Sequence, residues 1–148
     1  YKSIDQLPEG ATVAIPNGTS EVTRSLLLLD AHGVIKLDNR DGEKTEKNIV
    51  SNPKKLQFKP LESATLPRVL DQVDLAIINT NYALQAKLNP LKDAIILEDK
   101  QSPYVNVLAA KKDKANDPRL QKLAKALNSP EVKKFIEEKY KGAVIPAF

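Results

Sequence analysis

Short apolar runs alternate with helix-like stretches along this chain. Residues 13–15 and 74–78 are apolar at almost every position, which is typical of strands that are buried on both faces. Residues 56–59 alternate between apolar and polar side chains, which predicts a half-buried strand. Residues 21–31 have a polar start and an apolar body, which predicts a helix. The same reasoning predicts further strands at 94–97 and 104–110, and short helices at 45–50, at 65–72 and from 79 onward.

This alternation of strands and helices predicts an α/β fold with a largely parallel or mixed sheet. Local signals also predict where helices begin and end. Asp117 and Ser129 are capping residues, and each is followed by a proline at the first helical position. Gly33 and Gly142 are predicted to end helices, Gly33 in the left-handed conformation. Residues 3–6 match a capping box that opens a short helical turn.

Polar side chains follow several of the predicted strands. In α/β folds, small ligands lie at the carboxyl ends of the strands, near the helix N-termini. Arg24 stands out, because a guanidinium one or two turns inside a helix offers a planar fork to a carboxylate or a phosphate. The alternative is that Arg24 is a solvated helix charge. The other polar residues expected at this edge are Asn17, Asn79, Asn81 and Asn106.

Composition excludes several classes of function. The net charge is +4, but basic and acidic residues are interleaved and only 5% of residues are aromatic, so nucleic-acid binding is not expected. The chain has no cysteine and one histidine, His32, which excludes thiolate chemistry and a site of several histidines. No base is spaced to activate a nucleophile. We therefore expect no catalysis, no metal and no cofactor. No apolar run is long enough to span a bilayer.

A set of sequence stretches points to a known family. They are residues 10–17 (Gly-Ala-Thr-Val-Ala-Ile-Pro-Asn), 24–29, 52–56, 66–68, 74–83, 102–106 (Ser-Pro-Tyr-Val-Asn) and 129–144. In this order they resemble the C-terminal part of the methionine-binding lipoproteins, which are MetQ/NlpA-type substrate-binding proteins of ABC importers. The resemblance spans nearly the whole chain and is more specific than any single motif.

The resemblance implies a periplasmic-binding-protein-like fold in which two α/β lobes grip a ligand between them. Residues 1–12 would form a crossing segment and a helical turn, and residues 13–105 would form the complete second lobe. Residues 106–148 would supply a crossing strand and the C-terminal helices of the first lobe, whose N-terminal half is missing from this chain. An apolar face on 106–148 would then be uncovered, which predicts self-association of the chain.

The resemblance also implies a function. The protein would capture an amino acid, with methionine as the expected ligand, and deliver it to a membrane permease and its ATPase. It would be an extracytoplasmic lipoprotein of the cell membrane, held by an N-terminal lipid anchor absent from this segment. Glu21 stands where the family commonly has an amide side chain, so another amino acid or a methionine-containing dipeptide stays open. A ligand-sensing module of a regulator is the alternative from another class, and the reading frame upstream of Tyr1 would distinguish it.

The resemblance implies the ligand-binding residues as well. Arg24 would hold the α-carboxylate, and Asn79 and Asn106 would contact the polar backbone of the ligand. Tyr82 would line the site or pack in the core. Each has a plainer alternative, such as Asn79 serving only to cap the following helix. Tyr104 is expected in packing, Arg68 in a surface or interlobe ion pair, and His32 as a favourable charge at a helix C-terminus.

Overall fold

The computed structural model describes residues 1–99 and 102–148. The chain divides into two compact units, Tyr1–Glu98 and Asp99–Phe148. The predicted lobe boundary lay later, between residues 105 and 106. The assignment of the two parts to two lobes stays a prediction.

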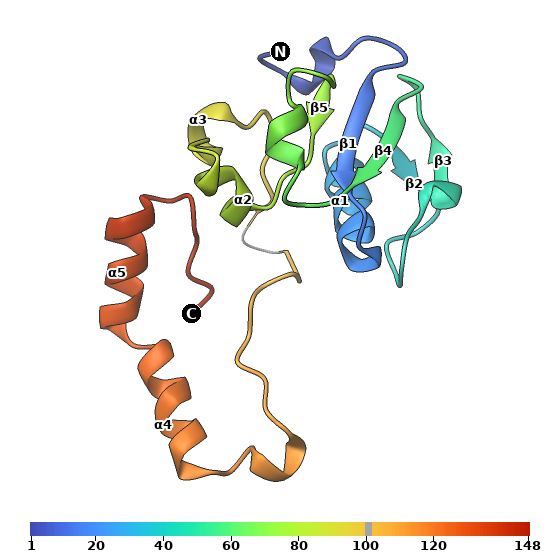
Figure 1. Cartoon of the computed structure of the whole chain (residues 1–148). Coiled ribbons are helices and arrows are strands. Elements are labelled where there is room, and N and C mark those ends of the chain that lie inside the picture. Colours follow the sequence, from blue (N-terminus) through green and yellow to red (C-terminus); the bar gives the residue numbers. More distant parts are fainter. Residues whose placement is uncertain (100–101) are drawn as a thin grey trace. The chain divides into compact units, whose positions relative to one another are not determined.

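A three-stranded parallel sheet forms the centre of the first unit (Figure 1). Strand β1 (Thr12–Pro16) lies between β4 (Gln57–Leu61) and β5 (Leu75–Ala76). Val13 pairs with Phe58 on one side and with Leu75 on the other. Residues 13–16 of the central β1 are buried, which explains why they are all apolar.

Strand β5 is shorter than the predicted strand at 74–78, although its backbone pairing continues beyond both ends. The N–H of Asp74 donates to the Thr12 carbonyl (3.0 Å), and the N–H of Ile77 donates to the Ala14 carbonyl (2.9 Å). The predicted strand at 94–97 is wrong. Ile95 and Ile96 form bends, and Ile96 packs against the core. Only Ile95 and Ile96 of this run are half-buried, while Ala94 and Leu97 are exposed, so the apolar run marks neither a strand nor a buried segment.

Helix α1 (Thr19–Ala31) follows β1 and confirms the predicted helix. Leu26 and Leu29 lie on its inner face and are wholly buried in the core. Gly33 follows the helix with φ +70°, and the N–H of Val34 donates to the Leu29 carbonyl (2.9 Å). The predicted left-handed glycine is therefore confirmed, and its positive φ closes the helix without the strain a side chain would bring.

The polar segment after α1 forms a second, antiparallel sheet from β2 (Lys36–Leu37) and β3 (Ile49–Ser51). The predicted helix at 45–50 is wrong, since only one 3-10 turn, η2 (Glu46–Asn48), forms before β3. Thr45 and Asn48 cap this turn reciprocally. The β-branched Ile49 then turns into the extended conformation and pairs with β2.

Short helices complete the first unit. The capping signal at residues 3–6 produces a single 3-10 turn, in which Ser3 Oγ accepts from the Asp5 N–H (3.2 Å). The predicted helix at 65–72 is also reduced to one 3-10 segment. These elements are η1 (Ile4–Gln6), η3 (Leu66–Val69), α2 (Thr80–Gln85) and α3 (Pro90–Asp93).

The second unit contains η4 (Lys112–Lys114), α4 (Pro118–Leu127) and α5 (Pro130–Tyr140). Both predicted helix starts are confirmed, since Asp117 accepts from the Arg119 N–H and Ser129 from the Val132 N–H. The predicted strand at 104–110 is wrong: the segment has no ladder partner among the described residues. No helix in the described part of the chain is long and apolar enough to cross a membrane.

Candidate functional site

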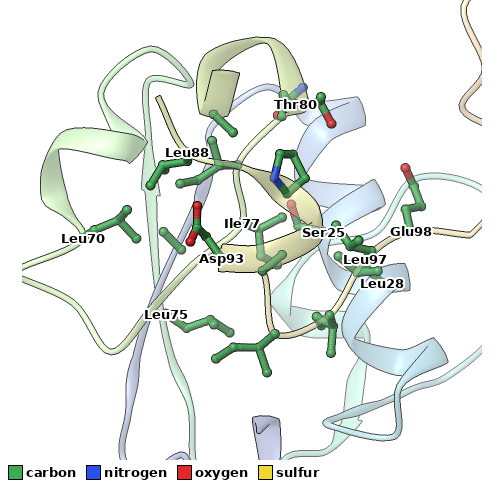
Figure 2. A pocket seen from close by; sticks show the side chains of 18 of the residues that line it. Ser25, Leu28, Leu70, Leu75, Ile77, Thr80, Leu88, Asp93, Leu97 and Glu98 are labelled. Carbon is green, nitrogen blue, oxygen red and sulfur yellow. The ribbon is translucent and has the colours of Figure 1, made fainter. Parts of the chain in front are cut away.

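A pocket of about 360 Å³ lies within the first unit, where β1 and β5 end (Figure 2). Pro16 contributes from the end of β1, and residues 76–80 contribute from β5 and the segment that follows it. The chain leaves β1 for β4 on one side and later returns to β5 on the other side. The pocket therefore lies where the strand order reverses, which is the general ligand position in open parallel sheets.

Most of the pocket wall is apolar. Leu28 comes from α1, Leu75 and Ile77 from β5 and its continuation, and Leu88 from the segment before α3. In Figure 2 the labelled side chains of Ser25, Leu28 and Glu98 lie on the α1 side of the pocket. A small, mostly apolar pocket that includes an arginine and several carboxylates suits a ligand that has one polar end and one apolar end.

Arg24 lines this pocket, as the strand-to-helix pattern around it predicted. Its Nε–H donates to Glu98 Oε1 (2.9 Å) and Oε2 (3.0 Å), and its Nη2 pairs with Oε2. The guanidinium thus grips a carboxylate through one edge of its fork. The Arg24 and Glu98 side chains are 39% and 28% exposed, so a small molecule can reach the pair.

Asn79 lines the same pocket as Arg24. It is the N-cap residue of α2 by its backbone, and its carbonyl accepts from the N–H groups of Tyr82 (3.0 Å) and Ala83 (3.1 Å). Its side chain makes no capping hydrogen bond to the helix. The alternative that its amide serves only as a cap therefore lacks support.

The other expected site residues are placed differently. Tyr82 is half-buried on α2 and is not among the residues that line the pocket. Asn106 belongs to the second unit and is exposed. Asn17 and Asn81 are exposed and do not line the pocket either. The ligand roles of Arg24, Asn79, Asn106 and Tyr82 stay predictions.

Three further residues had been assigned to packing or to the surface. Arg68 is exposed in η3. His32 is the C-cap residue of α1, with Nδ1 2.9 Å from the Leu28 carbonyl oxygen, close to the predicted place at the helix end. Tyr104 is half-buried in the second unit, where its N–H donates to Ser102 Oγ. None of the three lines the pocket.

Glu21 lies in the first turn of α1 and lines the pocket. Its carboxylate accepts from the Ser63 hydroxyl (3.2 Å) and folds back over Gly18, where a Cβ would collide with it. A side chain at position 18 would therefore push the Glu21 carboxylate out of this position. A carboxylate in the first turn of a helix is also favoured by the helix dipole. Glu21 consequently lines the pocket and does not turn away to solvent.

Asp74 fixes the N-terminal segment at the rim of the pocket. It accepts from the Thr12 N–H (2.8 Å) and from the Tyr1 hydroxyl (2.9 Å). The hydrogen bond from Thr12, and then that from Tyr1, lowers the pKa of the Asp74 carboxyl. The bond to Asp74 in turn raises the pKa of the Tyr1 hydroxyl. Both residues line the pocket, so this pair shapes its edge.

Glu98 was not among the site residues predicted from the sequence. The only signal was its place as the first charged residue after the apolar run at 94–97. Its contact with Arg24 joins residues 74 positions apart, which no local pattern reveals. Within the described residues, no group of three or more potential metal ligands comes together.

Comparison with known proteins identifies the family. The family model described as "NlpA lipoprotein" matches residues 1–148. The chain belongs to this family. It is 45% identical over 145 residues to a probable D-methionine-binding lipoprotein MetQ of Vibrio cholerae, covering 97% of this chain and 54% of that protein. It is 40% identical to the methionine-binding lipoprotein MetQ of Bacillus subtilis, covering 99% and 55%.

Solved structures agree with this assignment. One is a nutrient-binding protein from Burkholderia cenocepacia bound to methionine, with a TM-score of 0.92 and 49% identity over 100% of this chain and 63% of that one. Another is a periplasmic substrate-binding protein of an ABC transporter from Coxiella burnetii, with a TM-score of 0.91 and 44% identity over 99% and 62%. The predicted periplasmic-binding-protein-like fold is confirmed. The chain spans about half the length of the curated relatives it matches.

Proposed function

We propose that this chain is part of the substrate-binding component of an ABC importer, and that the ligand is methionine. The observation that carries the proposal is the Arg24 fork at one side of an apolar pocket, where it already grips a carboxylate. An amino acid with an apolar side chain has the same two requirements: a bidentate cation for its carboxylate and an apolar wall for the rest. The likeness to a protein solved with methionine supports this ligand.

The proposed roles follow from this arrangement. Arg24 binds the α-carboxylate, and the Asn79 amide, which is not used as a helix cap, contacts the polar backbone of the ligand. Asn106 and Tyr82 are proposed to complete the site when the full-length protein closes on the ligand. The protein is not an enzyme in this proposal, since it releases the amino acid unchanged.

The proposed partners and location rest on the relatives. Several are named lipoproteins, and one is a periplasmic substrate-binding protein of an ABC transporter. We therefore place the full-length protein outside the cytoplasm, anchored to the membrane by a lipid, where it delivers its ligand to a permease driven by an ATPase.

One observation favours a second ligand class. Glu21 lines the pocket with a negative charge three residues before Arg24 on the same helix. In a methionine-containing dipeptide, the ammonium lies farther from the carboxylate than in a free amino acid. With its carboxylate on Arg24, such a dipeptide would place its ammonium at a different point of the pocket than methionine does. Calorimetry with methionine and with glycylmethionine separates the two ligands.

The test of the proposed function is calorimetry on the full-length protein with Arg24 replaced. Loss of a charge-assisted pair in a closed site should cost about 2–5 kcal/mol of binding free energy for Arg24→Ala. Arg24→Lys should be nearly as damaging, because an ammonium offers no planar fork. Arg68→Ala is the matched control, since Arg68 is exposed and outside the pocket. An Arg24→Ala protein that binds methionine as tightly as the parent would remove Arg24 from the site.

A further inference from the structure

The pocket carries more acidic than basic side chains. Among the described residues that line it, Glu21, Asp74, Asp93 and Glu98 are acidic, and Arg24 is the one cationic side chain. A ligand that brings only a carboxylate would add negative charge to this site. A ligand that brings an ammonium as well would restore the balance, because opposite charges at close range stabilise each other.

Three of these carboxylates accept hydrogen bonds from donors other than Arg24. Glu21 accepts from a serine hydroxyl, and Asp74 from a backbone N–H and a tyrosine hydroxyl. Asp93 accepts from the Asn89 N–H (2.6 Å). The partner of Glu98 is Arg24 itself, the group proposed to take the ligand carboxylate.

These contacts create competition for one edge of the guanidinium. Glu98 occupies the Nε–Nη2 edge of Arg24, which is the edge that grips a carboxylate side-on. When a ligand carboxylate takes that edge, Glu98 loses its counter-charge inside a largely apolar pocket. A ligand ammonium would replace the counter-charge that Glu98 gives up, because opposite charges at close range stabilise each other.

We propose that Glu98 recognises the ammonium group of the ligand through an exchange of ion pairs. In the ligand-free protein, Glu98 holds the Arg24 fork. On binding, the ligand carboxylate replaces Glu98 on Arg24, and Glu98 accepts the ligand ammonium. In an amino acid, one carbon separates the carboxylate from the ammonium. This short separation matches the side chains of Arg24 and Glu98, which are already in contact. The assignment rests on the proposed function.

The exchange makes the site selective for zwitterions. A carboxylic acid that lacks the ammonium has to displace Glu98 and offers it nothing in return. Des-amino methionine, which keeps the carboxylate and the thioether chain of methionine, is therefore expected to bind much more weakly. Charge-assisted hydrogen bonds are among the stronger polar contacts, so we expect a preference for methionine of about 10- to 100-fold.

The experiment compares these two ligands by calorimetry on the full-length protein, with Glu98 intact and with Glu98→Gln. The substitution keeps the size of the side chain but removes its charge. Methionine affinity should fall about 10- to 100-fold. Affinity for des-amino methionine should hold or rise, because its carboxylate no longer competes with Glu98. The preference between the two ligands should therefore collapse.

Glu9→Gln is the matched control. Glu9 pairs with Lys55 on the exposed surface, outside the pocket, so its loss should leave both affinities unchanged. Thermal melting of ligand-free Glu98→Gln should stay close to that of the parent, because partly exposed ion pairs contribute little to stability.

Two results would overturn the assignment. If Glu98→Gln changes both affinities by the same factor, Glu98 acts only as a competitor for Arg24 or only in the fold. If the unsubstituted protein binds des-amino methionine as tightly as methionine, the site does not recognise an ammonium at all, whatever the variant does. Failure of the proposed function looks different, since the unsubstituted protein would then bind neither ligand.

Discussion

The two units of this chain differ in what holds their helices in place. In Tyr1–Glu98, the central strand and α1 bury their apolar side chains in a common core, and Val13, Ile15 and Leu26 are wholly buried. In Asp99–Phe148, no described residue is buried, although α4 and α5 have well-formed caps. Helix capping therefore depends on local sequence, whereas burial needs a partner surface.

The second unit displays the apolar residues that a core would need. Val107 is 75% exposed, and Leu123, Leu127 and Phe135 are also exposed. Phe135 has a nearby cation, Lys139 Nζ, 5.0 Å from its ring centre. The resemblance predicted that residues 106–148 pack on a part of the first lobe that lies outside this chain. Leu120, Val132 and Ile136, which belong to the same predicted apolar face, are half-buried, and the missing half-lobe stays a prediction.

The largest expected effect is self-association of the 148-residue chain. Soluble monomers rarely expose broad apolar patches, so isolated copies should join through the second unit or through sheet edges. Light scattering and binding of an apolar dye measure this. A monodisperse monomer that binds no dye would show that the second unit covers its own apolar residues, and the predicted missing half-lobe would be wrong.

A leucine-to-alanine substitution, made once in each unit, tests the difference in burial between the units. Leu26→Ala opens a cavity in the core and should cost about 2–5 kcal/mol of unfolding free energy. Leu123→Ala removes a side chain that is 44% exposed and should cost little in the 148-residue chain. Urea denaturation measures both. The difference between the two losses of unfolding free energy should shrink in the full-length protein if Leu123 is covered there. Equal losses for the two substitutions in the 148-residue chain would contradict the comparison.

A smaller effect is expected from two ion pairs. The buried Asp30 carboxylate accepts from the Leu37 N–H (3.0 Å) and pairs with Arg40 (2.7 Å). Asp30→Ala leaves that N–H unpaired and should cost about 1–3 kcal/mol. Glu138→Ala breaks only an exposed pair with Lys134 in α5 and should cost less than about 0.5 kcal/mol. Equal costs in urea denaturation would contradict the comparison.

Lowering the pH should reduce the contribution of Asp30 to the free energy of unfolding. Burial raises the pKa of Asp30, but the hydrogen bonds from Leu37 and Arg40 and the charges of Arg40 and Lys36 outweigh it, so the pKa is lowered. The stabilisation is therefore present above the unfolded value of about 4 and is lost as pH falls through the folded value. The difference in unfolding free energy between the parent and Asp30→Ala should therefore decrease below about pH 4. A constant gap down to low pH would contradict this.

Local signals predicted much of the fold. Strand β1, helix α1 with Gly33 after it, and the starts of α4 and α5 follow from apolar runs and capping residues that act within a few positions. The strands predicted at 94–97 and 104–110 did not form. An apolar run favours burial and strand formation, but both need a partner surface, and in this chain most of these apolar residues are exposed.

The candidate site was predictable only in part. Arg24 and Asn79 follow strand ends, and the parallel sheet brings both to one pocket. Glu98 could not be predicted, because its contact with Arg24 depends on how the chain folds back over 74 positions. The position of Asn106 relative to the pocket is likewise a tertiary property that its sequence motif does not encode.

The most direct test of the proposed site is the NMR signal of the Arg24 Nε–H during a methionine titration of the full-length protein. Loss of the signal in Arg24→Lys assigns it, and Arg40, which pairs with Asp30 outside the pocket, is the internal reference. Because methionine is proposed to take the fork that Glu98 holds, the Arg24 signal should shift in step with binding while that of Arg40 stays unchanged. Saturation of the protein with methionine without any change in the Arg24 signal would contradict the account.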